Sequence, residues 1–176
     1  YKITVEVTNT GERAGKEVVQ LYYAPPYEAG GIEKSAVVLA DYAKTGELQP
    51  GKKEEVTLSV KARDMASYDF NDSNQNGFAG YELDPGTYVL SLRKNAHETA
   101  DIPNAQISLK LAENIQYPTD EITGTVVSNK MTGKDAVDGV GIDGSDSGQK
   151  ISYMSRSDFD TTFPKEPVKT RKLSEK

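Results

Sequence analysis

The sequence has no cysteine, no tryptophan and a single histidine, His97, among its 176 residues. Without cysteine the chain cannot form disulfides, use a thiolate nucleophile or build a cysteine-ligated zinc site. One histidine is also too few for a multi-histidine metal site, and no partner constellation for a His-dependent catalytic triad is evident. A structural histidine in a loop is the favoured interpretation of His97, with a catalytic base as the alternative.

Positive charge is also in deficit, because 27 aspartates and glutamates outnumber 21 lysines and arginines, which gives a net charge of -6 and an isoelectric point near 4.9. Phosphate neutralisation dominates nucleic-acid affinity, so an acidic chain without a basic stripe argues against nucleic-acid binding. The same deficit argues against binding to anionic membranes. Apolar runs such as residues 37–40 are far too short to span a bilayer. Residues 1–8 do not resemble a signal peptide, and their strand-like pattern suggests a piece cut from a longer polypeptide.

Short segments of alternating apolar and polar residues recur along the first part of the chain. In residues 1–8, the side chains of Ile3, Val5 and Val7 share one face, which is typical of a half-buried strand. Further strands are predicted at residues 17–24, 36–42, 55–60, 80–83, 88–93 and 106–111, with a single helical turn within residues 62–68. About seven short strands with turns between them and no long helical period predict an all-β sandwich. Residues 83–88 (LDPGTY) predict a tyrosine corner, in which the phenol of Tyr88 bonds back to the preceding loop.

The chain changes character after about Glu113. Glycine and aspartate dominate residues 119–150, a composition that predicts a linker or an irregular insertion. Aromatic residues return in residues 151–163, where we expect them to dock on a neighbouring domain because they are costly to leave exposed. These features predict a sandwich at residues 1–112, a Gly/Asp-rich linker or insertion at 113–150, and a docking segment with a charged tail at 151–176. The C-terminal extension is therefore expected to be long and mostly irregular.

Several spaced motifs resemble one known module. They are residues 7–11 (VTNTG), 14–23 (AGKEVVQLYY), 32–34 (IEK), 39–44 (LADYAK), 48–51 (LQPG) and 86–88 (GTY). In this order they resemble the fibronectin type III-like domain of glycoside hydrolase family 3, the β-glucosidase family, over roughly residues 1–112. The resemblance implies an immunoglobulin-like or fibronectin type III-like sandwich that is a non-catalytic accessory module without a cofactor. Its parent would hydrolyse terminal β-linked glucosides or related sugars with retention.

The tail carries a second resemblance. Residues 152–159 (SYMSRSDF) and 162–164 (TFP) look like the junction of a rearranged subset of the family, in which the sandwich lies between an α/β domain and a (β/α)8 barrel. The resemblance implies that these two domains of the same parent are its partners. The family's sandwich normally has one strand before Tyr1, so its absence implies an unpaired edge. For a bacterial parent, the lack of cysteine favours the cytoplasm and leaves secretion open.

Ser157, Asp158 and Phe159 resemble the Ser-Asp-Trp context of the nucleophilic aspartate in family 3 barrels. The flanking residues differ, and nothing here supplies the barrel that holds two carboxylates about 5 Å apart. We therefore expect no catalytic residue in this chain. The expected docking residues are Tyr153, Arg156, Asp158, Phe159 and Phe163. Arg156 and Asp158 would hydrogen-bond across the interface, with Phe159 and Phe163 as apolar anchors.

A calcium-loop frame starts at Asp72 and continues with Asn74, Asn76 and Gly77. The twelfth position, which needs a bidentate glutamate, holds Leu83, and Glu82 is one place early. The alternative interpretation is a polar hairpin with its turn at Asn76-Gly77, and we expect no metal site. The aspartates at positions 138, 143 and 146 could also bind a cation, although a solvated loop is the favoured interpretation.

Exposed tyrosines could stack against sugar rings, and the candidates are Tyr22, Tyr23, Tyr27, Tyr42 and Tyr81. Tyr22 and Tyr23 are neighbours on one strand and must point to opposite faces, so at most one belongs to the core. The absence of tryptophan weakens a carbohydrate-binding interpretation. Two alternatives to an accessory module remain: a carbohydrate-binding module and an immunoglobulin-like surface or adhesive domain. The second predicts a tandem copy, and the sequence contains no internal repeat.

Overall fold

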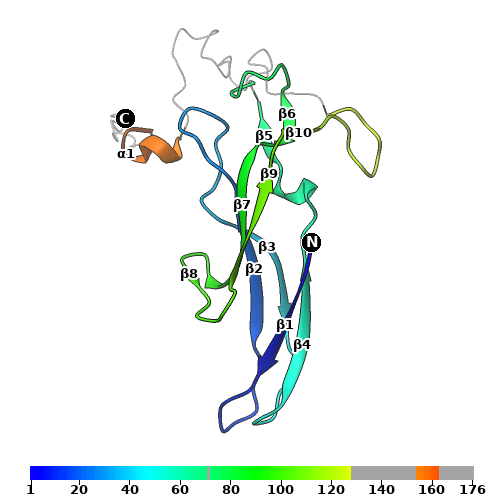
Figure 1. Ribbon diagram of the computed structural model, residues 1–176, viewed down its shortest axis with the longest axis vertical. Helices are drawn as coiled ribbons and strands as arrows, with labels where there is room; N and C mark the ends of the chain where they lie inside the picture. The colour runs from blue at the N-terminus through cyan, green and yellow to red at the C-terminus, as the bar shows by residue number, and fades with distance from the viewer. Residues whose placement is uncertain (71, 128–153, 163–176) are drawn as a thin grey trace, which may run out of the picture. The chain divides into compact units, whose positions relative to one another are not determined.

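The computed structural model describes residues 1–70, 72–127 and 154–162. The chain divides into two compact units, Tyr1–Lys130 and Met131–Lys176, and each is described by itself. The first unit consists of antiparallel strands in sheets (Figure 1), which confirms the predicted all-β class. No helix among the described residues is long and apolar enough to cross a bilayer.

The largest sheet has five strands. Its members are β2 (Val18–Ala24), β3 (Val38–Lys44), β7 (Gly86–Asn95), β8 (Glu98–Thr99) and β9 (Gln106–Leu111). β2 pairs with β3 on one side and with β7 on the other, so that Leu21 lies opposite Leu92 and Tyr23 opposite Leu90. Directly opposed residues share a face of the sheet, and this register places all four side chains on its inner face.

Two smaller sheets complete the first unit. One pairs β1 (Lys2–Thr8) with β4 (Lys53–Ser59), and the other has the order β10 (Ile115–Tyr117), β6 (Gly80–Leu83), β5 (Ser67–Asp69). Within the described part of the chain β1 pairs with β4 alone, so its other edge has no neighbouring strand. The backbone amide of Ser59 donates to Asp41 Oδ2 at 2.7 Å, which links β4 to β3.

The core lies between the inner faces of these sheets. Its buried members are Leu21, Tyr23, Leu58, Val60, Met65, Leu83, Tyr88, Leu90 and Leu92. Ile3 and Val5 of β1 pack against this cluster and alternate with exposed neighbours, as predicted from the period-two pattern. Burial of each such aliphatic side chain contributes about 1.5–3 kcal/mol to folding, so this cluster is the main source of stability.

The seven predicted strands are present; β6 and β9 have the predicted boundaries, and the other five differ by one or two residues. Three short strands, β5, β8 and β10, were not predicted, because segments of two or three residues are too short for alternation to be recognised. The predicted helical turn is confirmed as the 3-10 turn η1 (Arg63–Met65).

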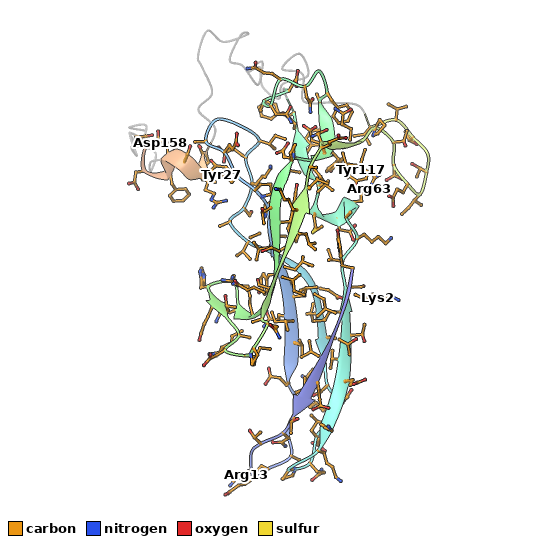
Figure 2. All side chains as sticks on the ribbon, viewed as in Figure 1. Lys2, Arg13, Tyr27, Arg63, Tyr117 and Asp158 are labelled. Carbon is orange, nitrogen blue, oxygen red and sulfur yellow. The ribbon has the colours of Figure 1, made fainter. Side chains whose placement is uncertain are left out.

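Arg63 contacts two residues of the segment that follows β9, Tyr117 and Thr119. Its guanidinium lies 5.2 Å from the centre of the Tyr117 ring, a cation–π arrangement; both residues are labelled in Figure 2. The same group donates a hydrogen bond of 2.9 Å to the carbonyl of Thr119. Thr119 in turn forms an isolated β-bridge with Val126. Ordered backbone pairing therefore continues past residue 112, while the predicted domain boundaries stay a prediction.

The second unit contains two short elements among its described residues, the 3-10 turn η3 (Arg156–Asp158) and the helix α1 (Phe159–Thr162). Ser155 Oγ accepts a 3.2 Å hydrogen bond from the backbone amide of Ser157, which caps the start of η3.

Candidate interdomain site

The turn between β6 and β7 is closed by the predicted tyrosine corner. Tyr88 Oη donates a 3.2 Å hydrogen bond to the carbonyl of Asp84, four residues earlier. The Tyr88 side chain is buried in the core, and burial, assisted by the negative charge of Asp84, raises the pKa of its phenol well above the ordinary value. The hydroxyl therefore stays protonated as a hydrogen-bond donor, which fixes the position of Asp84.

The side chain of Asp84 meets Lys34, which lies in the loop after β2. Lys34 Nζ forms an ion pair with Asp84 Oδ2 and also donates to the carbonyl of Pro26 at 3.0 Å. The Lys34 side chain is 4% exposed and the Asp84 side chain 18% exposed. Since a buried ammonium is costly without a counter-ion, this pairing ties residues 25–36 to the β6–β7 turn.

Gly86 allows the two loops to approach each other. Its φ of +138° is rarely adopted by residues with a side chain, and a Cβ there would lie 2.7 Å from Pro26 Cβ. Glycine is therefore required at this position both by the backbone conformation and by the closeness of Pro26.

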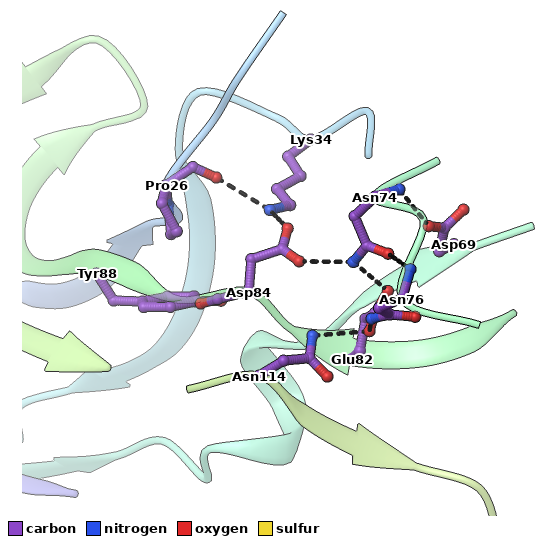
Figure 3. Close-up of polar contacts among 9 residues, drawn as sticks. All are labelled: Pro26, Lys34, Asp69, Asn74, Asn76, Glu82, Asp84, Tyr88 and Asn114. Carbon is purple, nitrogen blue, oxygen red and sulfur yellow. Dashed lines mark hydrogen bonds and ion pairs between the residues drawn. The ribbon is translucent and has the colours of Figure 1, made fainter. Parts of the chain in front are cut away.

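Glu82 of β6 is the centre of a second set of contacts, shown in Figure 3. Its carboxylate, 1% exposed, accepts hydrogen bonds from three amide side chains: Asn74 at 2.8 Å, Asn76 at 2.6 Å and Asn114 at 2.7 Å. Asn74 Nδ2 also donates to Asp84 Oδ1 at 3.1 Å and so joins this set to the Lys34 ion pair. Because a buried carboxylate needs donors, Glu82 holds the 72–77 loop and the residues before β10 in place.

The 72–77 loop has a turn geometry set by Asp72. Asp72 Oδ1 accepts hydrogen bonds from the backbone amides of Asn76 at 2.8 Å and Gly77 at 3.1 Å. Gly77 has a φ of +79°. The loop connects the antiparallel strands β5 and β6, which is the polar hairpin that the sequence offered as the alternative to a calcium loop. No group of three acidic or histidine side chains in the described ranges is arranged to hold a metal ion.

Members of these two sets line an open cleft of about 620 Å³, namely Lys34, Asn74, Asn76, Asp84 and Asn114. Residues 28–32 line one side, and Ser73, Asn74, Gln75 and Asn76 line the other. The lining offers amide and carboxylate groups that are held in place by the hydrogen bonds and the ion pair described above. Such a surface can bind another protein segment or a small polar ligand.

Comparison with known proteins assigns residues 17–96 of the first unit. Residues 17–96 match the family model of the fibronectin type III-like domain. These residues are a fibronectin type III-like domain. The chain is 45% identical over 96 residues to β-glucosidase A of Butyrivibrio fibrisolvens and 43% identical over 89 residues to a β-glucosidase of Ruminococcus albus. The matches cover 54% and 50% of this chain, but only 11% and 9% of those two relatives.

Solved structures give the same result. A β-glucosidase from Paenibacillus barengoltzii is similar with a TM-score of 0.55 and 36% identity, over 65% of this chain and 12% of that chain. β-Glucosidase 3B from Thermotoga neapolitana is similar with a TM-score of 0.52 and 29% identity, over 66% of this chain and 14% of that chain. The fibronectin type III-like domain thus corresponds to a small part of much longer enzymes.

The expected docking residues lie outside the fibronectin type III-like domain. Arg156 and Asp158 belong to η3, and Phe159 begins α1 with about half of its surface exposed. Tyr153 and Phe163 fall outside the described residues, as do the aspartates at 138, 143 and 146. Their docking role stays a prediction.

The tyrosines of the fibronectin type III-like domain have different environments. Tyr23 belongs to the core cluster, and Tyr22 lies on the opposite face of β2, as the alternation of a strand requires. Both are buried, at 8% and 7% exposure, so the expectation that at most one would be a core residue holds only for the main cluster. Tyr42 on β3 is 65% exposed, and Tyr81 on β6, in a different sheet, packs edge-on against Tyr68. Tyr27 Oη donates to Glu33.

His97 lies in the exposed turn between β7 and β8, where its backbone amide donates to Asn95 Oδ1 at 2.8 Å. Sequence reasoning did not find the structural roles of Lys34 and Glu82. The sequence indicated Lys34 only as part of the motif at residues 32–34. It indicated Glu82 only as a residue one place before the twelfth position of a calcium-loop frame. Lys34 stands between Glu33 and Ser35, and Glu82 between Tyr81 and Leu83, so no local pattern marks either residue as buried.

Proposed function

We propose that this chain is an accessory module of a glycoside hydrolase family 3 enzyme, which supports the catalytic domains and takes no part in catalysis. Its partners would be the (β/α)8 barrel and the α/β domain of the same polypeptide. The parent reaction would be retaining hydrolysis of terminal β-linked glucosides or related sugars. The similarity to a small part of several β-glucosidases supports this proposal.

The state of the buried carboxylates is the observation that carries the proposal. A retaining glycosidase needs two carboxyl groups about 5 Å apart that face the substrate. In the fibronectin type III-like domain, Asp69 and Glu82 are 0% and 1% exposed, and Glu82 is engaged by three amide donors. Carboxylates in this state hold loops together and cannot reach a sugar.

The second unit would supply part of the interdomain contact. Arg156 and Asp158 offer charge-assisted hydrogen bonds, and the half-exposed ring of Phe159 offers apolar surface to a partner. Tyr153 and Phe163 would extend the same contact on either side.

A chimaera tests the supporting role. The segment of β-glucosidase A from Butyrivibrio fibrisolvens that matches this chain is replaced by the corresponding residues of this chain, and a second variant lacks the segment. We expect the chimaera to retain most of its kcat on an aryl β-glucoside and the deletion to lose activity and thermal stability. A deletion as active and as stable as the intact enzyme would contradict the proposal.

The non-catalytic role is tested on the 176-residue chain itself with the same substrate. We expect no turnover above buffer, for the original chain and for Asp158→Asn alike. Turnover that disappears in Asp158→Asn would show that the chain carries a catalytic carboxylate.

A further inference from the structure

Asn76 and Gly77 form the only Asn-Gly pair in the sequence. In such a pair the backbone nitrogen of glycine can reach the side-chain amide carbon of asparagine with little hindrance, because glycine has no Cβ. Both residues are exposed, and the space where a Cβ of Gly77 would lie is open. Water and hydroxide therefore reach this pair in the folded protein, and the hydrogen bonds of the loop oppose the reaction.

Those hydrogen bonds engage both reacting groups. The backbone N–H of Gly77 donates to both oxygens of Asp72, each at 3.1 Å. Asn76 Nδ2 donates to Glu82 Oε2 at 2.6 Å, and Asn76 Oδ1 accepts from the backbone amide of Phe78 at 2.9 Å. We propose that Asn76 is a deamidation site protected by the closed 72–77 loop, and that Asp72 protects it by holding the Gly77 N–H.

The reaction needs no cofactor. The backbone nitrogen of Gly77 loses its proton to a solvent base and attacks Cγ of Asn76, a new N–C bond forms, and Nδ2 leaves as ammonia. The product is a five-membered succinimide. A water molecule then adds to one of its two carbonyl carbons and breaks the bond from that carbon to nitrogen, which leaves either aspartate or isoaspartate. Asp72 opposes the first step, because a carboxylate that accepts the Gly77 N–H disfavours loss of that proton.

The product would disturb the lining of the cleft. Asn76 would lose the donor that now lies 2.6 Å from Glu82 Oε2, and a second negative charge would take its place. Two carboxylates at that separation repel, and the loop would be released from β6. Because Asn74 and Asn76 line the cleft, the modification would loosen one of its sides irreversibly.

The experiment follows Asn76 over time in the 176-residue chain at mildly alkaline pH by peptide mass spectrometry with an isoaspartate assay. The reference is the same chain in urea. We expect the folded chain to deamidate at Asn76 at least about tenfold more slowly than the unfolded chain, since opening must break hydrogen bonds to charged groups. Asp72→Ala should remove about tenfold of this protection, and Asp72→Asn, which keeps one acceptor oxygen, should remove less.

Asp120→Ala is the matched control. Asp120 also accepts backbone amides, from Ile122 at 3.0 Å and Thr123 at 2.8 Å, but in a different turn of the first unit. It should leave the rate at Asn76 unchanged. Equal rates in folded and unfolded chains, or a folded Asp72→Ala chain with the original rate, would overturn the proposal. If circular dichroism shows that Asp72→Ala is unfolded, the deamidation rate of the folded Asp72→Asn variant is compared with that of the original chain instead.

Hydrogen exchange of the deamidated product supplies an independent readout. The amides of residues 74–78 should exchange faster than in the unmodified chain, while those of β2 and β7 keep their rates. Unchanged exchange in residues 74–78 would overturn the inferred release of the loop.

Discussion

Lys34 and Asp84 form a largely buried ion pair between residues that are 50 positions apart in the sequence. The pair joins the loop after β2 to the turn before β7. In the other ion pairs found among the described residues, at least one side chain is more than half exposed. Exposed pairs contribute little to stability. We therefore expect the loss of the Lys34–Asp84 pair to lower the free energy of unfolding more than the loss of any of these exposed pairs.

Lys34→Met should lower the free energy of unfolding by about 2 kcal/mol, because it leaves the partly buried Asp84 carboxylate without its cation. Urea denaturation followed by circular dichroism measures the change. The double variant Lys34→Met with Asp84→Asn should regain part of the loss, since it removes both charges.

The control for this prediction is Lys53→Met, which removes the exposed cation paired with Glu6. Its urea midpoint should stay close to that of the original chain. A Lys34→Met variant with a midpoint equal to that of Lys53→Met would show that the buried pair adds nothing.

Tyr88→Phe should lower stability by about 1 kcal/mol, the net value of the hydrogen bond to the Asp84 carbonyl. It should also change the pH dependence. Burial raises the pKa of Tyr88 in the folded chain above the ordinary value of about 10. The folded state then retains a proton that the unfolded state releases, so stability falls as the pH rises from about 10 towards the folded-state pKa.

Urea unfolding measured at several alkaline pH values tests whether stability falls as the pH rises. The Tyr88→Phe chain should lose less stability above pH 10 than the original chain, and Tyr42→Phe, which alters an exposed ring, is the matched control. A steeper alkaline loss in Tyr88→Phe would contradict the assignment.

The sandwich could be predicted from the sequence because its strands show patterns that depend only on neighbouring residues. Alternation in β1 and the β-branched and aromatic residues of β2 act within a few neighbouring positions. The tyrosine corner was also predictable, because Tyr88 bonds to a carbonyl only four residues away.

The polar contacts of the cleft could not be predicted in the same way. Lys34 meets Asp84 and Asn114 meets Glu82 only after distant segments have been brought together by the sheets. No local pattern specifies such pairs. The run from Asp72 to Gly77 resembled a calcium loop because Asn and Asp are favoured both as metal ligands and in turns.

Gly86→Ala should destabilise the chain by more than about 2 kcal/mol, because it adds a strained φ and a clash with Pro26 at 2.7 Å. Gly51→Ala separates the two causes. Gly51 has a φ of +75° but nothing within 4 Å of an added Cβ, so it should cost only about 1–2 kcal/mol. Thermal unfolding of both variants makes the comparison, and a smaller loss for Gly86→Ala than for Gly51→Ala would contradict the contact with Pro26.

Glu82→Gln should be more damaging than its small change in volume suggests. The carboxylate accepts from three amide side chains, and a glutamine would turn an NH₂ group towards at least one of these donors. A buried donor without an acceptor costs about 1–3 kcal/mol, so we expect a loss of about 2 kcal/mol in urea denaturation. Glu55→Gln, on the exposed side of β4, is the matched control and should unfold like the original chain.

Hydrogen exchange of the Glu82→Gln chain should show lost protection in residues 72–77 before any loss in β7. Equal exchange across both segments would mean that Glu82 supports the whole sandwich and not the loop.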